Sequence, residues 1–459
     1  MASNQACVIG GSITGLVAAR VLSDHFDQVA LFDRDTLPTE TANRKGVPQG
    51  WHGHGLLASG FSALKQMFPD LEHDLLEAGA VAGDVIGDVR WFQHGYYKAK
   101  FQSGLGGILL SRPLLETSIR AQVRKLPNVS IVHNAHVHGL LTDADRKRVS
   151  GIRVQQTGGS AADHHAALVV DASGRGSRAP EWLAELGYSK PATDEVEVSL
   201  GYTSRTFKRR PHDLNGDMGA ILAPKPPKTR VGFMLAMEGE RWIASIGGWT
   251  GDYAPTDPQG FLEFARSLSR PDIYEVIKDA EPLTDAVTYR FPCNLRRRYE
   301  RLEKFPAGFL VMGDAICSFN PIYGQGMSVT SLEALALGAC LERGMTAENV
   351  WRPFIKEASK IIETPWTIAA GSDFAFNGVT GPKPAGTDAI NWYLERVHRV
   401  ASTDKVVCRA FFDVANLLAP ATTLFHPRVV GRVVKGSMGS RKVDGRESSV
   451  VSRESIVAD

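Results

Sequence analysis

The fold is decided by ACVIGGSITGLVAARVLSDHFDQVALFDRD, residues 6–35. This stretch begins with an apolar run that predicts a buried strand, followed by a glycine turn, an amphipathic helix and a second strand that ends in acidic residues. A strand, a glycine turn, a helix and a strand in this order open the nucleotide-binding domains of the α/β class. We therefore expect a Rossmann-like domain to begin at about residue 6.

The glycine turn itself predicts a phosphate site. Gly10, Gly11 and Gly15 surround Ser12, which stands where the usual G-x-G-x-x-G pattern has its second glycine. Serine is small enough for a pyrophosphate to approach the backbone, and the helix N-terminus supplies free N–H groups. Asp33 stands where an acid accepts ribose hydroxyls, which favours an unphosphorylated ribose, as in FAD or NAD. The alternative at this point is a glycine turn that binds no nucleotide.

Composition points to a soluble protein that acts on small molecules. The chain has 459 residues, of which 43% are hydrophobic, so it can bury a large core. Its formal net charge of +2 lacks the basic excess of a nucleic-acid binder. Its 5 cysteines form no CxxC pair, which predicts neither a disulfide framework nor a zinc site. With no signal-peptide pattern and no apolar run of transmembrane length, we expect a cytoplasmic protein without a transmembrane segment.

The hydrophobic pattern divides the chain into segments of different character. Alternating runs such as VEVSLGYTSRTF predict an antiparallel sheet inserted into the nucleotide-binding domain. The C-terminal part has helical patterning, and its end is rich in Ser, Arg and Glu. The predicted division is a nucleotide-binding domain of residues 1–80, 111–180 and 291–345, a substrate domain of 81–110 and 181–290, a helical region of 346–436, and a disordered tail of 437–459.

A second glycine-rich segment is LVMGDAICSFNPIYGQGMSVTSLEALAL, residues 310–337. It places Asp314 after a buried strand, and Pro321, Gly324 and Gly326 before a long helix. Together with the first glycine turn, this segment resembles the FAD-dependent monooxygenases of the p-hydroxybenzoate hydroxylase fold. Within that family the chain resembles the branch that contains bacterial polyether epoxidases and related tailoring oxygenases.

The resemblance implies an FAD site built from several segments. Arg44 corresponds to an arginine near the adenosine and pyrophosphate of FAD, Arg112 to one near the phosphate or ribityl chain, and Asp314 to the aspartate that bonds the ribityl chain. Free N–H groups at Gly326 and Met327 would stabilise negative charge on reduced flavin. The implied FAD-binding residues are Gly10, Gly11, Ser12, Gly15, Asp33, Arg34, Arg44, Arg112, Asp314, Pro321, Gly324, Gly326 and Met327.

Three positions depart from the family pattern. Ser173 replaces the usual aspartate of the segment DASGRGSR, which weakens a role of this segment in docking NAD(P)H. Cys317 stands where many relatives have histidine, and Trp51 stands where this branch usually has arginine.

Two histidines follow Trp51 in RKGVPQGWHGHGLL, residues 44–57. His52 and His54 share one face of an extended segment and could hold a metal, but no third ligand has a matching spacing, so we expect no metal site. The resemblance instead implies a flavin-side loop, in which either histidine could bond the cofactor or relay a proton. A structural role, with the rings bonded to loop carbonyls, is the equal alternative.

The inserted sheet offers the expected substrate site. Tyr202, Phe233, Leu235 and Trp249 are the substrate candidates, because the flavin ring would face this sheet. Each of them could equally be an ordinary core residue.

The resemblance implies an enzyme in which NAD(P)H reduces FAD, O2 forms the C4a-hydroperoxyflavin, and one oxygen atom goes to a lipophilic or aromatic substrate by epoxidation or hydroxylation. A separate flavin reductase could supply the electrons. One alternative is an FAD-dependent reductase of isoprenoid double bonds, as in geranylgeranyl reductases. Another is a flavoprotein that binds a ligand without turnover. A flavin halogenase is disfavoured, because the W-x-W-x-I-P motif is absent from the sequence.

Overall fold

A computed structural model describes residues 4–439. Its first sheet has five parallel strands in the order β17-β11-β1-β2-β7. β1 and β11 are almost wholly buried, as expected for parallel strands with both faces covered. The strands are β1 (Gln5–Ile9), β2 (Gln28–Phe32), β7 (Val129–Val132), β11 (Leu168–Asp171) and β17 (Phe309–Val311).

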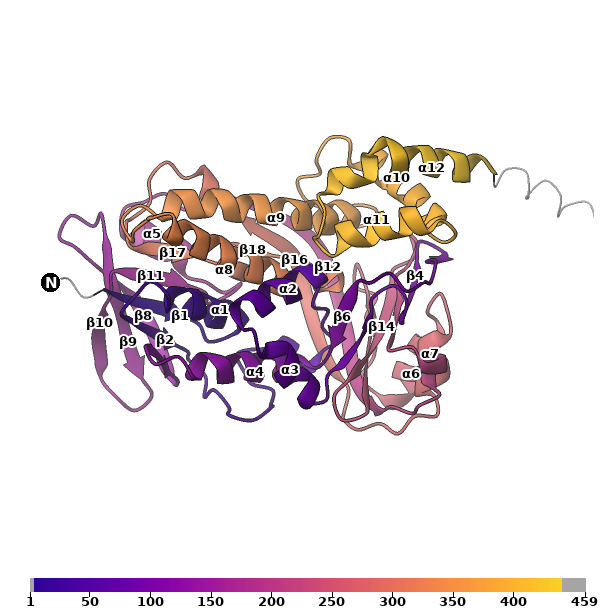
Figure 1. Cartoon of the computed structure of the whole chain (residues 1–459), viewed down its shortest axis with the longest axis horizontal. Coiled ribbons are helices and arrows are strands. Elements are labelled where there is room, and N and C mark those ends of the chain that lie inside the picture. The colour runs from indigo at the N-terminus through magenta and orange to yellow at the C-terminus, as the bar shows by residue number, and fades with distance from the viewer. Residues whose placement is uncertain (1–3, 440–459) are drawn as a thin grey trace, which may run out of the picture.

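Helices and a small antiparallel sheet cover the parallel sheet (Figure 1). The helix α1 packs on α4 and α8, and α8 packs on α2 and α9. The helices are α1 (Ile13–Leu22), α2 (Ala58–Met67), α3 (Leu71–Glu77), α4 (Arg112–Arg124), α5 (Ala179–Glu185), α8 (Gly326–Glu342) and α9 (Trp351–Asp373). The small sheet has the order β10-β9-β8 and consists of β8 (Ala135–Thr142), β9 (Val149–Gln156) and β10 (Ala161–His165).

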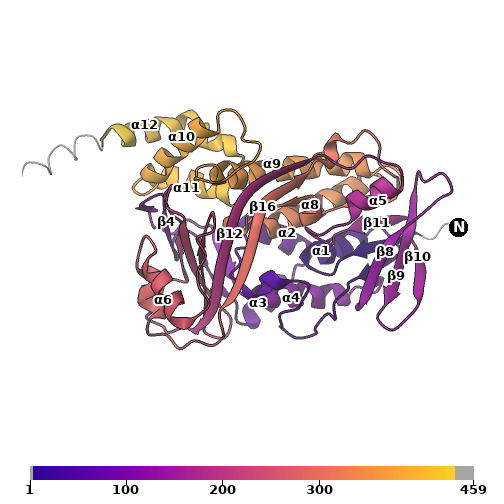
Figure 2. The ribbon, with the colours of Figure 1, turned by 180° about the vertical axis from the view of Figure 1, so that it is seen from behind.

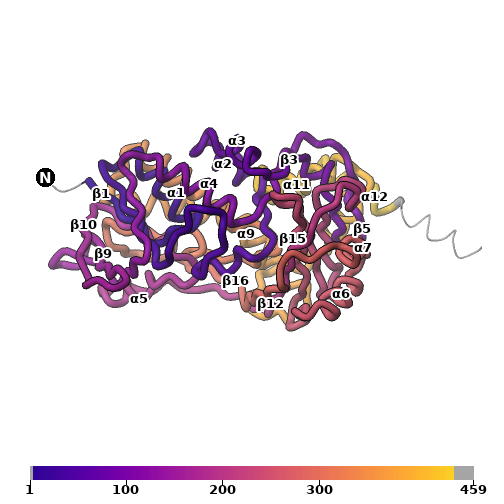
Figure 3. The backbone as a smooth tube through the Cα atoms, turned by 90° about the horizontal axis from the view of Figure 1, so that it is seen from below, coloured from indigo at the N-terminus to yellow at the C-terminus, as the bar shows by residue number. Residues whose placement is uncertain are grey.

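A sheet of eight strands forms the other end of the elongated molecule (Figure 3). Its order is β18-β16-β12-β15-β14-β13-β4-β5, and all neighbours are antiparallel except β13 and β4. The long strands β12 and β16 run toward the parallel sheet and so join the two halves (Figure 2). The strands are β4 (Val89–Gln93), β5 (Tyr96–Tyr97), β12 (Thr193–Lys208), β13 (Gly219–Leu222), β14 (Arg230–Met237), β15 (Arg241–Gly248), β16 (Val287–Arg297) and β18 (Cys317–Ser318).

The remaining elements flank the large sheet. β3 (Val81–Asp84) and β6 (Gly106–Leu109) form a separate pair, and α6 (Pro258–Arg266) and α7 (Asp272–Ile277) lie at the outer end. A C-terminal group consists of α10 (Thr387–Val400), α11 (Lys405–Ala415) and α12 (Pro427–Gly439). The 3-10 turns are η1 (Pro48–Trp51), η2 (Asp213–Gly216), η3 (Tyr299–Arg301), η4 (Gly313–Ala315), η5 (Pro321–Tyr323) and η6 (Ala421–Phe425).

The predicted fold class is confirmed: a Rossmann-like α/β domain carries an inserted antiparallel sheet and a helical C-terminal region. Three predicted boundaries fall inside elements. The boundary between residues 180 and 181 lies in α5. β16 continues through residue 291, because its ladder with β12 extends to Arg297. The helix α12 includes residues 437–439, which were predicted to belong to the tail, and the rest of that tail, 440–459, lies outside the described residues. Within residues 4–439, no helix is long and apolar enough to cross a bilayer.

Candidate functional site

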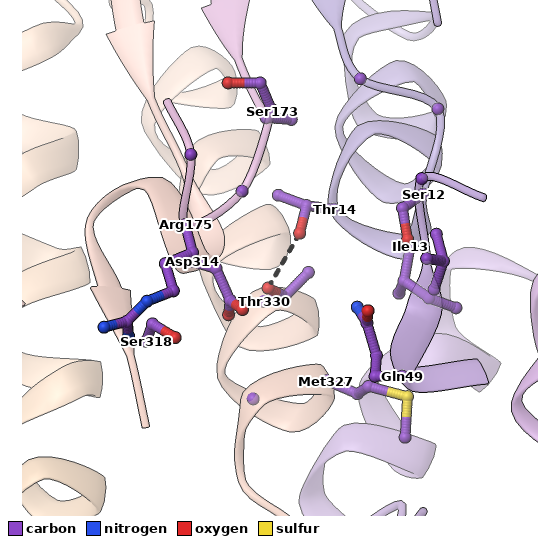
Figure 4. Close-up of a pocket in the computed structure, with 18 of the residues that line it drawn as sticks. Ser12, Ile13, Thr14, Gln49, Ser173, Arg175, Asp314, Ser318, Met327 and Thr330 are labelled. Carbon is purple, nitrogen blue, oxygen red and sulfur yellow. Dashed lines mark hydrogen bonds between the residues drawn. The ribbon is translucent and has the colours of Figure 1, made fainter. Parts of the chain in front are cut away.

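A cavity of about 610 Å³ lies between the parallel sheet and the eight-stranded sheet. Ile9, Phe32 and Ala172 line it where β1, β2 and β11 end, and Tyr202 and Tyr289 line it from β12 and β16. Open α/β sheets bind their ligands at this carboxyl edge, so the cavity is the candidate ligand-binding site. Figure 4 shows Ser12 and Ile13 on one side and Asp314 on the other, with Thr14 and Thr330 between them.

Most of the residues that the resemblance assigned to FAD line this one cavity. They are Gly10, Gly11, Ser12, Asp33, Arg34, Arg44, Arg112, Asp314, Pro321, Gly324, Gly326 and Met327. Gly15 lies behind the turn instead, where an added Cβ would be 1.7 Å from the carbonyl oxygen of Gly10. The structure therefore gives Gly15 a packing role, because only glycine lets α1 approach the turn this closely.

The glycine turn presents its backbone to the cavity. Gly10 has a φ of 104°, and a Cβ there would lie 2.6 Å from the carbonyl oxygen of Ala172, so the turn requires glycine. The N–H of Gly11 donates to Asp33 Oδ2 at 2.6 Å. Ser12 precedes α1 without capping it through its side chain, and the first turn of α1 carries no acidic residue. The positive end of α1 is therefore free to attract an anion.

A buried carboxylate, Glu116, holds the arginines of the site. Arg44 Nε donates to Glu116 Oε1 at 2.8 Å, and Arg120 donates to the same oxygen at 2.7 Å. Ser12 bridges the group, since its hydroxyl donates to Glu116 and accepts from Arg112. Burial would raise the pKa of Glu116, but Arg112, Arg44 and Arg120 hold it below its usual value. Glu116 is thus ionised, and its negative charge stabilises the three arginine side chains around it.

Glu116 is not among the site residues predicted from the sequence. A signal was available, because Arg112, Glu116 and Arg120 are spaced i, i+4, i+8 and share one face of the predicted helix. The start of that helix follows from its sequence: Ser111 caps α4 by accepting from the N–H of Leu114, and Pro113 occupies the first turn.

The arginines keep unused donors at the cavity. Among the described residues, Arg44 Nη2 and Arg112 Nε are buried and have no hydrogen-bond partner. Both side chains line the cavity. Buried donors without partners are costly, so these nitrogens are expected to bond an anionic ligand. A pyrophosphate beside the α1 N-terminus fits this donor set.

The second helix end at the cavity belongs to α8. Its first turn has no acidic residue, and the preceding Gly324 has a φ of 67°, which turns the chain into the helix. Thr14 of α1 and Thr330 of α8 are bonded at 3.2 Å between their hydroxyls, so the two helix N-termini lie side by side (Figure 4). Burial raises the pKa of Asp314, against the opposing effect of Arg112 and Arg175.

His52 lies behind the cavity, where the structure defines its hydrogen-bonding role. The N–H of Gly53 donates to Ser245 Oγ at 3.2 Å, Ser245 and Ser204 are 2.5 Å apart at Oγ, and Ser204 Oγ is 2.7 Å from His52 Nδ1. Each serine hydroxyl can donate one hydrogen bond and accept two, so Ser204 and Ser245 link the Gly53 N–H to His52 Nδ1 with either tautomer of the ring. His52 Nε2 is buried and has no hydrogen-bond partner among the described residues.

His54 lines the cavity itself. Its Nδ1 is 2.9 Å from the carbonyl oxygen of His52, so Nδ1 donates and Nε2 remains an acceptor. Burial, aided by Arg112, lowers the pKa of His54 to about 3, and burial lowers that of His52 to about 4. Both rings are therefore neutral at physiological pH. Among the described residues, no group of three or more His, Cys, Asp or Glu side chains could hold a metal ion.

The four substrate candidates occupy different surroundings. Tyr202 lines the cavity, and Phe233 lies behind it with its ring 2.6 Å from where a Cβ on Gly53 would be. Leu235 packs in a small apolar cluster of the sheet. Trp249 stacks on Phe376 and donates its indole N–H to Asp373, which places it in the core and not on the cavity.

The three departures from the family pattern also have defined positions. Ser173 lines the cavity, and its N–H donates to Asp171 Oδ1 at 2.9 Å. Cys317 is buried in β18. Trp51 is 45% exposed and is not among the cavity residues, so its exchange for the usual arginine changes the protein surface.

No model of a known protein family matches the chain. Protein Rv3254 of Mycobacterium tuberculosis is 31% identical over 457 residues, which cover 94% of this chain and 93% of the relative. This chain belongs to the same family as Protein Rv3254. The name of that relative states no activity, so solved structures provide the further comparison.

Several solved structures share the fold of this chain, which is a relative of Protein Rv3254, at low sequence identity. A flavoprotein/dehydrogenase from Cytophaga hutchinsonii is 14% identical, with a TM-score of 0.69 over 95% of this chain and 100% of that chain. The p-nitrophenol 4-monooxygenase PnpA from Pseudomonas putida is 17% identical, with a TM-score of 0.65 over 90% and 98%. The flavin-dependent brominase Bmp2 is 13% identical, with a TM-score of 0.63 over 96% and 99%. The predicted fold of FAD-dependent monooxygenases is confirmed, and the polyether-epoxidase branch stays a prediction.

Proposed function

We propose that this chain is an FAD-dependent monooxygenase that transfers one oxygen atom from O2 to a lipophilic substrate, with NAD(P)H as the reductant. In the balanced reaction, substrate, O2, NAD(P)H and a proton give the oxygenated product, NAD(P)+ and water. The main support is the convergence of two helix N-termini and unpartnered arginine nitrogens on one cavity. Proteins of this fold include a p-nitrophenol 4-monooxygenase, which supports an oxygenase, and also a flavin-dependent brominase.

The cavity residues divide along the length of an FAD molecule. We assign Asp33 to the adenosine ribose, and Arg112, Ser12 and the α1 N-terminus to the pyrophosphate. Asp314 is assigned to the ribityl chain, and the N-terminus of α8 to the flavin ring. When bound, FAD accepts electrons from NAD(P)H and passes them to O2.

The remaining wall of the cavity is assigned to the substrate. Tyr202, Tyr289 and Phe291 present aromatic rings there from β12 and β16. Burial raises the pKa of both tyrosines, so they stay protonated. An apolar wall excludes water and orients a lipophilic molecule for oxygen transfer.

The chemistry of this wall favours epoxidation over hydroxylation of a phenol. A phenol benefits from a general base with a pKa near the working pH. His54 lines the cavity, but its lowered pKa of about 3 makes it a weak base. An alkene needs no base, because its π electrons attack the oxygen directly. We therefore propose an electron-rich alkene as the substrate class.

The proposed reaction belongs in a reducing compartment. The 5 cysteines are all buried and free, as expected of a cytoplasmic protein. NAD(P)H could reduce the flavin directly, or a separate reductase could deliver the electrons. Stopped-flow reduction by NADH and NADPH, with and without a free flavin reductase, distinguishes these routes.

The proposal is tested by the visible spectrum of the purified protein with FAD, followed by oxygen uptake. We expect flavin bands, and incorporation of one 18O atom from 18O2 into a lipophilic alkene with NAD(P)H consumed in equal amount. Absence of bound flavin would overturn the proposal. Product formation without O2 would favour a reductase of isoprenoid double bonds, and NAD(P)H oxidation that no compound stimulates would favour a binding protein.

A further inference from the structure

A buried aspartate, Asp373, ends the long helix α9 and accepts hydrogen bonds from several segments. Trp249 Nε1 donates to it at 2.9 Å, Asn294 Nδ2 at 2.8 Å, Asn320 Nδ2 at 3.0 Å and the hydroxyl of Tyr323 at 3.0 Å. Asp373 has no exposed surface. Four donors on one carboxyl group favour the ionised carboxylate, because both of its oxygens only accept.

These donors come from both halves of the molecule. Trp249 follows β15 and Asn294 lies on β16, so both belong to the eight-stranded sheet. Asn320 and Tyr323 belong to the segment 320–326, which leads into α8. Asn320, but not Tyr323, lines the cavity. Asp373 therefore joins the sheet of the substrate side to the segment that leads into the α8 N-terminus.

The start of segment 320–326 is fixed by further bonds in the same network. The N–H of Asn320 donates to Asn294 Oδ1 at 2.6 Å. Asn320 Oδ1 in turn accepts from the N–H of Ile322 at 3.1 Å and so caps η5. Asn320 can make these bonds only in one orientation, and its amide group points to Asp373 in that orientation.

We propose that Asp373 is a positioning residue that holds segment 320–326, and through it the N-terminus of α8, in the geometry that receives the flavin ring. This inference rests on the proposed function. Asparagine at position 373 would keep the shape but offer one acceptor oxygen and an NH2 group that faces donors. The segment would then lose bonds on the side of the cavity.

Protonation should loosen the segment in the same way. Burial raises the pKa of Asp373 to about 6, against the effect of its donors. Among the donors, Tyr323 is the titratable group, and burial together with Asp373 raises its pKa well above its usual value, so it stays protonated. If flavin binding requires all four hydrogen bonds to Asp373, the ionised form of Asp373 is favoured over the protonated form in the complex. Flavin affinity should then fall as the pH drops through about 6.

The test measures the Kd of FAD from pH 5 to 8 for the full chain and for Asp373→Asn. We expect the variant to raise Kd roughly tenfold or more at pH 7.5, since bonds to a charged acceptor are lost. We also expect it to lack the loss of affinity near pH 6. Asp314 lies in the cavity in both proteins, so its titration cancels in the comparison.

Asp213→Asn is the matched control. Asp213 is buried and accepts the indole N–H of Trp242 at 2.9 Å, but it does not line the cavity. Its variant should lower stability and leave the Kd of FAD unchanged. Tyr323→Phe removes a single hydroxyl donor to Asp373 and should raise Kd by a few-fold.

The outcomes separate the two proposals. An unchanged Kd and pH profile in Asp373→Asn, with flavin bound normally by the wild type, overturns the positioning role and leaves the proposed function intact. If Asp373→Asn does not fold, an unchanged Kd and pH profile in Tyr323→Phe overturns it. A wild-type protein that binds no FAD overturns both.

Discussion

At the scale of single residues, the site depends on charge compensation. Glu116 accepts from Arg44 and Arg120 and bonds Ser12, while Arg112 lies 3.6 Å from its other oxygen. Removing one partner of a buried ion pair leaves an uncompensated charge, which is more costly than the pair is favourable.

We expect Glu116→Gln to lower the free energy of unfolding of the FAD-free protein by roughly 3–5 kcal/mol. Saturating FAD should recover part of this loss, because a pyrophosphate would supply negative charge to Arg44 and Arg112. Urea unfolding with and without FAD checks both effects. Glu185→Gln, at an exposed position, is the control, and equal losses in the two variants would contradict the charge argument.

His52 gives a prediction about pH. Its pKa is about 4 in the folded protein and 6.5 when unperturbed, so between these values the unfolded chain binds a proton that the folded chain does not. The free energy of unfolding should therefore fall as the pH drops from 6.5 to 4, by on the order of 2–3 kcal/mol from this residue.

Urea unfolding of wild type and His52→Gln at pH 7 and pH 4.5 measures this contribution. The variant should lose less stability between the two pH values than the wild type does. His73→Gln, at an exposed position, should behave as the wild type. The same loss in all three proteins would show that His52 is not the group responsible.

At the scale of elements, the approach of α1 to the first turn decides whether the cavity forms. Gly15→Ala would place a Cβ 1.7 Å from the Gly10 carbonyl oxygen, so α1 must move away from β1. We expect a loss of about 3 kcal/mol or more and no measurable FAD binding. Thermal unfolding and FAD titration check this expectation.

Gly371→Ala is the matched control for a glycine inside a helix. A Cβ there has no atom within 4 Å, and Gly371 lies in α9. Alanine should stabilise the helix by roughly 0.5–1 kcal/mol and leave FAD affinity unchanged. If Gly15→Ala behaved like this control, the close approach of α1 would not be required.

At the scale of the whole molecule, the cavity between the two sheets is assigned to the full length of FAD. A comparison of FAD with the shorter FMN tests this assignment. FAD at about 100 times its Kd should raise the free energy of unfolding by about 2.7 kcal/mol. FMN lacks the adenosine half that we assign to Asp33 and the first glycine turn, so it should stabilise much less at the same concentration. Equal stabilisation by FMN and FAD would contradict the assignment of that turn.

The sequence predicted the elements whose signals are local. The glycine turn, the strand that ends near Asp33 and the cap at Ser111 follow from spacing and residue type within a few positions. The residues assigned to FAD were found because their motifs precede helices or follow strands, and these ends meet at one edge of a parallel sheet.

Residues whose roles depend on distant contacts were not predictable in this way. The alternation of hydrophobic and polar residues in β15 does not predict that Trp249, which follows this strand, donates a hydrogen bond to Asp373. Asp373 lies 124 positions later in the chain. The hydrogen bond at His52 Nδ1 depends on Ser204 and Ser245, which belong to two different strands of the large sheet.

The α/β class, the inserted sheet and the order of the cofactor motifs could be predicted from the residues alone, because hydrophobic periodicity and glycine spacing act over short distances. Contacts between distant segments determine which side chains face the cavity, which arginine nitrogens remain without partners, and which carboxylates neutralise the arginines. Those properties arise from burial and from hydrogen bonds between segments far apart in the chain, and no local pattern encodes them.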